Sequence, residues 1–176
     1  DLLDYFRLDN GKETILAKPF TIKGLGTRLS SEFAALADKK GIVLTVENSS
    51  DEIVLGDKEK ILRIGRNLLS NALKFTDAGS VTLRLNYSDG MLFLSVHDTG
   101  TGMNEEEQQH IFDAFKQLGN AATKDGFGLG LSIVKNLVSM MDGKIELQSK
   151  KNVGSTFMVE IPLPLVHEKD IERENN

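Results

Sequence analysis

The sequence predicts an α+β fold of two layers, with helices on one face of a mixed, mostly antiparallel sheet. Two observations carry this prediction. The strand-like segments come in adjacent antiparallel pairs, and each helix-like segment has a single apolar face. The 176 residues suffice for one sizeable core, and the hydrophobic fraction of 40% and charged fraction of 27% are ordinary for a globular domain.

The first half of the chain predicts two amphipathic helices separated by a strand. Residues 21–41 place apolar side chains at spacings of three and four, which predicts a helix closed by Gly41. The alternating stretch 42–47 predicts a strand. Asp57 is the expected N-cap of the next helix. The broad apolar face of that helix consists of Ile61, Leu62, Ile64, Leu68, Leu69, Ala72 and Leu73.

The second half predicts a hairpin, two helices and a closing pair of strands. Two alternating runs within 80–98 surround Asp89-Gly90, which is a strong hairpin signal. Asn104 and Glu107 have the spacing of a capping box, for a short helix ending near Phe112. The remaining expected segments are a mobile loop at 116–127, a helix from about Leu129 to Met141, and strands within 143–150 and 154–164.

The composition excludes several classes of protein. Cysteine is absent, so disulfides and thiolate metal sites are excluded, which fits a reducing compartment. The net charge of −5 is spread along the chain, and no nucleic-acid partner is expected because such binders usually have a concentrated basic face. No apolar run is long enough to span a bilayer.

Three glycines at two-residue spacing lie where the last helix begins: Gly126, Gly128 and Gly130. They do not fit the GxxxxGK[ST] phosphate loop, since Leu131 and Ser132 follow, nor the dinucleotide GxGxxG motif, which must follow a strand. Glycines still let backbone N–H groups approach an anion at a helix N-terminus. By themselves they leave phosphate binding and a flexible hinge as equal alternatives.

Asp98 ends a strand on its core-facing row, which also contains Leu92, Leu94 and Val96. A carboxylate there is costly unless it finds donors. Gly100 and Gly102 follow, so a flat group can approach the backbone, and the amino group of adenine would supply the donor. The alternative is a strand-end aspartate in an ordinary turn. His97 has the opposite parity and is interpreted as structural.

Asn67, Asn71 and Lys74 form one ridge of the second predicted helix. Asparagine is a poor residue for a helix interior, so two on one ridge suggest a function. Mg²⁺ is commonly held by few protein oxygens together with substrate phosphates and waters, which one amide and one lysine suit. A solvated helix face is the alternative, and it explains Lys74 more easily than Asn71.

Four segments together resemble the N, G1, F and G2 boxes of sensor histidine kinases. In chain order they are NLLSNALKFT, DTGTGM, IFDAF and GFGLGL, and the GST at 154–156 resembles the last glycine box. The resemblance covers about residues 14–163. It implies the Bergerat ATP-binding fold of the GHKL superfamily, which gyrase B, mismatch-repair ATPases and heat-shock chaperone ATPases share.

The resemblance implies a role for each matched position. Asn71 would bind Mg²⁺ with support from Asn67, and Lys74 would contact phosphate, so Asn71 and Lys74 are the expected catalytic residues. Asp98 would accept the adenine amino group, directly and through a water shared with Thr156. The other residues expected at the nucleotide site are Phe75, Gly100, Gly102, Met103, Lys124, Gly126, Gly128, Leu129, Gly130 and Leu131. The F-box pair, Phe112 and Phe115, is expected to pack under the lid.

The chain also departs from the family pattern. Family members often read GGTGLGL where this chain has Asp125 and Phe127 in the Gly and Thr positions. None of its three histidines has the sequence context of the phospho-accepting histidine. Residues 1–12 resemble the end of a dimerisation and phosphotransfer helix, 13–165 the catalytic ATP-binding domain, and 166–176 is interpreted as a charged tail or linker. We therefore expect a catalytic fragment of a longer kinase.

The implied function is transfer of the γ-phosphoryl group of Mg²⁺·ATP to a histidine on a separate dimerisation domain of the same kinase. The acceptor imidazole is the nucleophile, so no general base is expected. A response-regulator receiver domain is the implied downstream partner of a homodimeric bacterial parent. The resemblance implies a cytoplasmic location for this domain and allows an inner-membrane anchor in the parent.

Three alternatives stay open. The first is an ATPase of the same fold, although Asn67 stands where those ATPases carry a glutamate base, and an amide cannot take up a proton. The second is a degenerate, non-catalytic nucleotide-binding or interaction module. The third is a serine protein kinase of this fold.

Overall fold

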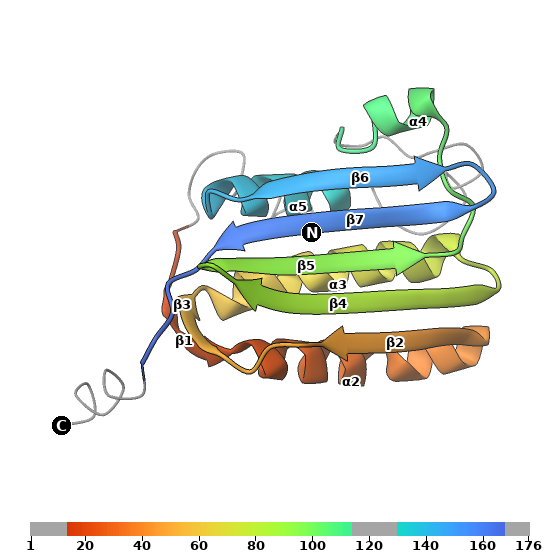
Figure 1. Ribbon diagram of the computed structural model, residues 1–176. Coiled ribbons are helices and arrows are strands. Elements are labelled where there is room, and N and C mark those ends of the chain that lie inside the picture. The colour runs from red at the N-terminus through yellow and green to blue at the C-terminus, as the bar shows by residue number, and fades with distance from the viewer. Residues whose placement is uncertain (1–13, 114–129, 168–176) are drawn as a thin grey trace.

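The computed structural model describes residues 14–113 and 130–167, and its main feature is a five-stranded sheet with strand order β2-β4-β5-β7-β6 (Figure 1). β2 pairs with β4 in parallel, and the other neighbours are antiparallel. The mixed, mostly antiparallel sheet is therefore as predicted. Its strands are β2 Ile42–Asn48, β4 Gly79–Ser88, β5 Met91–Asp98, β6 Lys144–Lys150 and β7 Gly154–Pro162.

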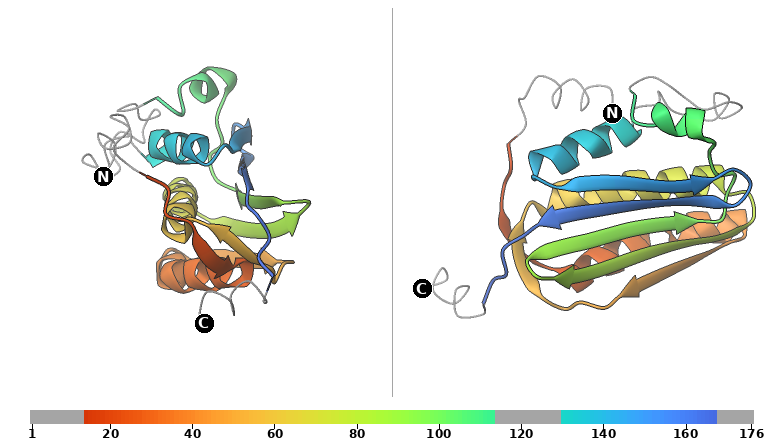
Figure 2. Two further views of the ribbon diagram at one scale, coloured as in Figure 1. Left: turned by 90° about the vertical axis from the view of Figure 1, so that its left-hand side faces the viewer. Right: turned by 45° about the horizontal axis from the view of Figure 1, so that its top comes forward.

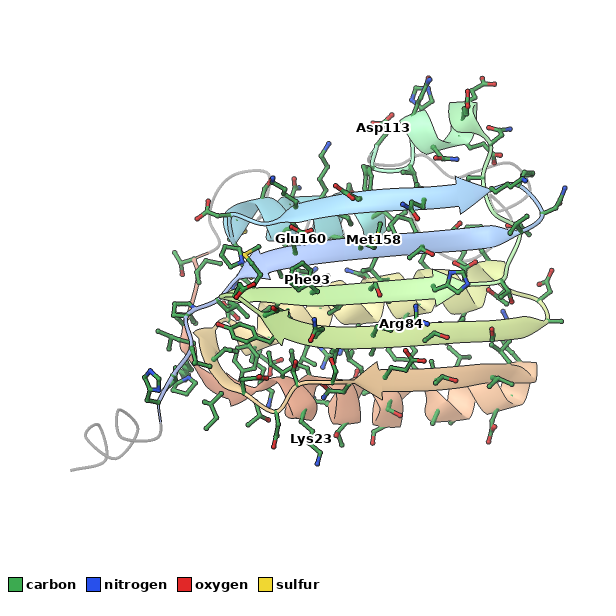
Figure 3. All side chains as sticks on the ribbon, in the orientation of Figure 1. Lys23, Arg84, Phe93, Asp113, Met158 and Glu160 are labelled. Carbon is green, nitrogen blue, oxygen red and sulfur yellow. The ribbon has the colours of Figure 1, made fainter. Side chains whose placement is uncertain are left out.

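Three helices, α2 (Ile22–Lys40), α3 (Lys58–Phe75) and α5 (Gly130–Met140), cover one face of this sheet (Figure 2). The apolar faces of helices and sheet meet in one continuous core. The other sheet face carries a mixture of polar and apolar side chains, including Arg84, Phe93, Met158 and Glu160 (Figure 3). This arrangement confirms the two-layer α+β fold. None of the helices within the described residues is long and apolar enough to cross a membrane.

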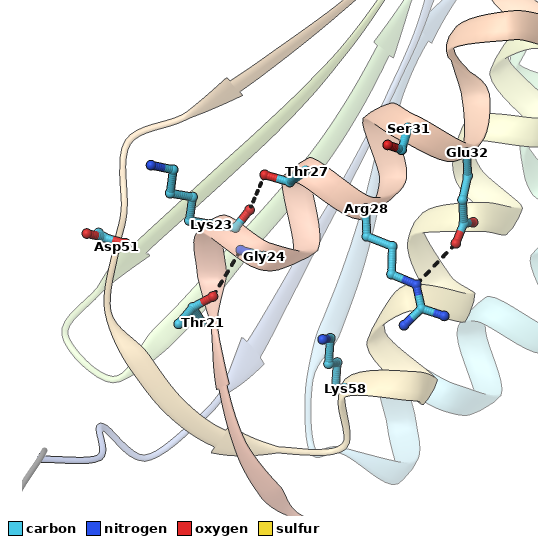
Figure 4. Close-up of a pocket in the computed structure, with 9 residues that line it drawn as sticks. All are labelled: Thr21, Lys23, Gly24, Thr27, Arg28, Ser31, Glu32, Asp51 and Lys58. Carbon is cyan, nitrogen blue, oxygen red and sulfur yellow. Dashed lines mark hydrogen bonds and ion pairs between the residues drawn. The ribbon is translucent and has the colours of Figure 1, made fainter.

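The helix ends follow the local signals of the sequence. Thr21 caps α2 by accepting from the N–H of Gly24 (Figure 4). Gly41 ends this helix at φ 70°. Asp57 caps α3 through the N–H of Lys60. Asn104 and Glu107 form the expected capping box of α4 (Glu105–Gln109). That helix ends at Gln109, before the expected position, because the chain continues as turns at 110–112.

A second, two-stranded sheet was not predicted. It pairs β1 (Lys18–Thr21) with β3 (Ile53–Gly56) in antiparallel register. Each strand has only four residues, too few to show alternation, and the partners lie far apart in sequence. The segment that follows β7 runs beside β3. Leu165 forms a bridge with Val54, and the N–H of Val166 donates to the carbonyl oxygen of Ile53. The backbone is therefore ordered through Val166. The loop expected at 116–127 lies outside the described residues.

Lys40, at the end of α2, holds the C-terminus of α3. Its Nζ donates to the carbonyl oxygen of Leu73, which is in the last turn of α3 and lacks a partner within the helix, and to that of Thr76, the residue after α3. We expect Lys40→Ala to lower the free energy of unfolding by about 1–2 kcal/mol. Urea denaturation measures this change. The exposed Lys39→Ala is the control, and equal effects of the two substitutions would contradict this role.

Candidate functional site

The Asp98 side chain lies at the end of β5, on the face of the sheet that the helices cover, and is only 5% exposed. Its Oδ1 accepts from the N–H of Gly100 at 2.9 Å. Burial raises the pKa of this carboxyl above its usual value, although the backbone N–H groups of Gly100 and Ser155 and the nearby His97 act in the opposite direction. Within residues 14–113 and 130–167 no ion pair neutralises Asp98. A buried carboxylate in this situation favours an external hydrogen-bond donor.

Glycines around Asp98 let backbone segments approach one another. A Cβ on Gly100 would overlap the Phe75 carbonyl oxygen, and one on Gly102 the Lys150 carbonyl oxygen. Gly102 also has φ +64°, which favours glycine. The Cβ side of Gly100 and Gly102 is therefore filled by backbone, and the approach of a flat group to these glycines stays a prediction for the other side of the chain. The glycines let the end of α3 and the β6–β7 turn close around the carboxylate.

The asparagine ridge lies on the half-buried side of α3, between its core-facing residues and solvent. Nδ2 of Asn67 is buried and has no hydrogen-bond partner among the described residues. Gly130, the first residue of α5, lies beside Oδ1 of Asn67, since a Cβ on this glycine would be 3.8 Å from that oxygen. Nζ of Lys74 is 5.6 Å from the ring centre of Phe75. The ridge thus offers amide groups and a cation, and its first member, Asn67, lies next to the start of α5.

The ridge and Asp98 belong to adjoining elements. Phe75 ends α3, and its carbonyl oxygen accepts from the N–H of Thr101, three residues beyond Asp98. Met103 and Leu131, which are also expected at the nucleotide site, are both buried in the core. Lys124, Gly126, Gly128 and Leu129 lie outside the described residues, as do Phe115, Asp125 and Phe127.

Thr156 does not lie on the Asp98 side of the sheet, so the expectation that it shares a water with Asp98 is wrong. In the β5–β7 ladder Asp98 is opposite Ser155, whereas Thr156 is opposite His97. The hydroxyl of Thr156 bonds Nδ1 of His97 at 2.7 Å, on the other face. Ser155 is therefore the hydroxyl next to Asp98. Strand parity alone could not identify it, because the register between β5 and β7 was unknown.

Phe112 of the F box packs on the sheet. Its ring meets that of Phe157 edge-on, with ring centres 6.3 Å apart, and Nζ of Lys135 lies 5.8 Å from the Phe112 ring centre. These contacts join the turn after α4 to β7 and α5. They support the packing role expected for this phenylalanine.

The donor set fits a nucleotide with its metal ion. A buried carboxylate with no cation partner among the described residues suits a base amino group. The Asn67 amide, whose Nδ2 has no partner in the same part of the chain, suits phosphate oxygens together with Lys74. The amide oxygen of Asn71, one turn beyond Asn67 on the same ridge, suits a hard cation such as Mg²⁺.

Comparison with known proteins points in the same direction. A family model described as "Histidine kinase-, DNA gyrase B-, and HSP90-like ATPase" matches residues 56–165. This range spans α3, β4, β5, α4, α5, β6 and β7. It therefore includes the asparagine ridge, Asp98 and Ser155.

Among curated relatives, the autoinducer 2 sensor kinase/phosphatase LuxQ of Vibrio cholerae is 35% identical over 182 residues, covering 99% of this chain and 21% of LuxQ. The sensor histidine kinase RcsC of Escherichia coli is 34% identical over 167 residues, covering 93% of this chain and 18% of RcsC. The chain thus spans about a fifth of the length of these relatives.

Two solved structures are similar in fold and in sequence. Full-length ShkA in complex with AMPPNP has a TM-score of 0.85 and 32% identity, covering 94% of this chain and 35% of ShkA. The nucleotide-free catalytic domain of the histidine kinase ThkA has a TM-score of 0.73 and 27% identity, covering 84% of this chain and 95% of that domain.

Proposed function

The chain belongs to the family of histidine kinase-, DNA gyrase B- and HSP90-like ATPases, and from this membership we propose that it is the ATP-binding catalytic domain of a two-component sensor histidine kinase. The observation that carries the proposal is the carboxylate of Asp98, which is buried beside Gly100 and Ser155 and has no ion-pair partner among the described residues. Similarity to two sensor kinases and to a nucleotide-bound kinase structure supports it.

In this proposal each part of the site has one task. Asp98 accepts the adenine amino group and fixes the base. Lys74 neutralises phosphate charge, and Asn67 donates to the same region an N–H that has no partner within residues 14–113 and 130–167. Asn71 supplies one oxygen ligand to Mg²⁺, which when bound offsets the charge of the phosphates. Positioning and charge neutralisation are what phosphoryl transfer requires of a protein, and the acceptor imidazole is itself the nucleophile.

The partners are proposed on the same basis. We assign residues 1–12 to the dimerisation and phosphotransfer domain, 13–165 to the catalytic domain, and 166–176 to a charged tail or linker. The accepting histidine lies on the dimerisation domain of a homodimeric parent, and a response-regulator receiver domain takes the phosphoryl group onward. The domain works in the cytoplasm, whether or not the parent is anchored in the inner membrane.

Phosphotransfer to a separate protein tests the proposal. The domain is mixed with labelled ATP, Mg²⁺ and a separately produced helical domain that carries the accepting histidine. An acid-labile, base-stable phosphoprotein is the expected product. Asn71→Ala should abolish it, whereas Ser70→Ala, at the neighbouring exposed position of α3, should not. An acid-stable product would indicate a serine kinase, and ATP binding without any product would indicate a non-catalytic module.

The isolated domain is expected to hydrolyse ATP at a negligible rate, far below the ~10 s⁻¹ that is typical of enzymes. The reason is that Asn67 occupies the place where a water-activating base would be needed, and its amide cannot accept a proton. Phosphate release from the isolated domain measures this rate. Turnover at an ordinary enzymatic rate that Asn67→Ala removes would show that the chain is an ATPase instead.

A further inference from the structure

Ser149 belongs to a row of three polar side chains across the sheet, beside the proposed base site. In the antiparallel ladders Asp98 is opposite Ser155, and Ser155 is opposite Ser149. Directly opposed residues share a face, so all three point toward the helices. Asp98 and Ser155 are buried, and Ser149 is half-buried at the sheet edge.

The Ser149 hydroxyl makes three contacts that join separate parts of the site. It accepts from the N–H of Met103 at 2.8 Å, lies 2.7 Å from the hydroxyl of Ser155, and lies 3.2 Å from the carbonyl oxygen of Gly154. The backbone oxygens of Ser149 and Met103 both accept from Nε2 of Gln108, at 3.2 and 2.9 Å. Ser149 therefore links the segment after Asp98 to the start of β7.

Only one assignment of hydrogen atoms makes all three contacts of this hydroxyl into hydrogen bonds. A serine hydroxyl has one hydrogen and two lone pairs. The carbonyl of Gly154 cannot donate, so Ser149 donates to it. Met103 donates to one lone pair of Ser149, and Ser155 must then donate to the other. The single hydroxyl hydrogen of Ser155 is consequently used, and this hydroxyl offers only lone pairs to its surroundings.

We propose that Ser149 is a positioning residue that makes the base site selective for a purine with an exocyclic amino group at the position facing Asp98. Because Ser149 accepts the hydrogen bond that the Ser155 hydroxyl can donate, two acceptors remain side by side. These are the carboxylate of Asp98 and the lone pairs of the Ser155 hydroxyl. An amino group donates to such a pair, whereas the carbonyl oxygen of guanine meets only acceptors. This inference rests on the proposed ATP-binding function and deepens it.

The test compares the dissociation constants of Mg²⁺·ATP and Mg²⁺·GTP by calorimetry. Ser149→Ala frees the hydrogen of Ser155 to donate to a carbonyl, so the preference for ATP over GTP should fall by about tenfold, a change of ~1.4 kcal/mol. Ser149→Thr keeps the hydroxyl and should restore the preference. Ser95→Ala, which removes a hydroxyl from the opposite face of β5, is the matched control and should leave the preference unchanged.

A mutant cycle with Ser155→Ala separates this role from simple support of the fold. If Ser149 acts through Ser155, the Ser155→Ala variant should also lose ATP preference, and the double variant should lose no more than either single variant. A Ser149→Ala variant that binds both nucleotides more weakly in equal proportion would overturn the inference while leaving the proposed function standing. Failure of the unaltered domain to bind ATP would overturn both. If Ser149→Ala does not fold, an unchanged preference in Ser155→Ala would overturn the inference.

Discussion

Replacing Asp98 with asparagine is expected to weaken ATP binding about 100-fold or more, since a hydrogen bond to a charged group contributes ~1.5–3 kcal/mol and the replacement also introduces a repulsive contact. Oδ1 of Asp98 is held by the N–H of Gly100 at 2.9 Å. An asparagine that keeps this bond presents an NH₂ group at the position of Oδ2. The adenine amino group would then face a donor instead of an acceptor.

The same substitution is expected to leave the fold at least as stable. Burial raises the pKa of Asp98, so the folded state takes up its proton more readily than the unfolded state. The charged form therefore destabilises the fold at neutral pH, and this effect disappears as the pH falls through the folded-state pKa to the unfolded value. The asparagine side chain carries no charge, so any gain in stability over the unaltered domain should be largest at neutral pH and shrink on acidification.

Calorimetry with Mg²⁺·ATP and urea denaturation across pH measure these two effects of Asp98→Asn. The exposed turn residue Asp89, with φ 52°, supplies the control, because asparagine tolerates this backbone conformation. Asp89→Asn should change neither quantity. An Asp98→Asn variant that binds ATP as well as the unaltered domain would rule out Asp98 as the base acceptor.

Gly102→Ala is expected to cost at least ~3 kcal/mol of folding stability, or to preserve the fold only by displacing the segment after Asp98 and so abolish nucleotide binding. Two effects combine at this position. The φ of +64° disfavours any side chain, and a Cβ would overlap the carbonyl oxygen of Lys150 and lie 3.2 Å from the nitrogen of Gly154. The N–H of Asn152, in the same β6–β7 turn, donates to the carbonyl of Thr101 at 2.7 Å, so the turn and this segment can move apart only by breaking that bond.

Gly41→Ala is the matched control for Gly102→Ala. Gly41 has a similar φ of 70°, but a Cβ there would meet nothing within 4 Å. Its substitution should therefore lower the free energy of unfolding only by the ~1–2 kcal/mol that a left-handed backbone costs a residue with a Cβ. The affinity for ATP should stay unchanged. Thermal or urea denaturation of both variants measures the difference. Equal losses of stability, with ATP binding retained in both, would show that close backbone approach at Gly102 is unimportant.

Local rules predicted the parts of the fold that depend on neighbouring residues. The left-handed end of α2 at Gly41, the N-cap at Asp57 and the hairpin turn at Asp89-Gly90 all follow from the residue types present. The core-facing position of Asp98 followed from the alternation of its strand. Such features require no knowledge of distant pairing.

The features that were missed depend on contacts between distant segments. β1 and β3 are too short to show a period, and each is stabilised by the other. The choice between Ser155 and Thr156 depended on the register of β5 against β7, which no local pattern gives. Likewise, positions 100 and 102 require glycine because the backbones of Phe75 and Lys150 approach them closely. Both of those residues come from other parts of the chain.

The most direct test of the central claim, an adenine-nucleotide site built around Asp98, is a titration of the isotope-labelled chain with Mg²⁺·ATP and Mg²⁺·GTP, followed by the amide resonances. We predict saturable binding of one ATP per chain, the largest shifts at Gly100, Gly102 and Ser155, and at least ~10-fold weaker binding of GTP, equivalent to ~1.4 kcal/mol. Equal affinity for the two nucleotides would contradict the claim. So would shifts centred on the pocket at the start of α2 (Figure 4), which includes Thr21, Arg28 and Lys58.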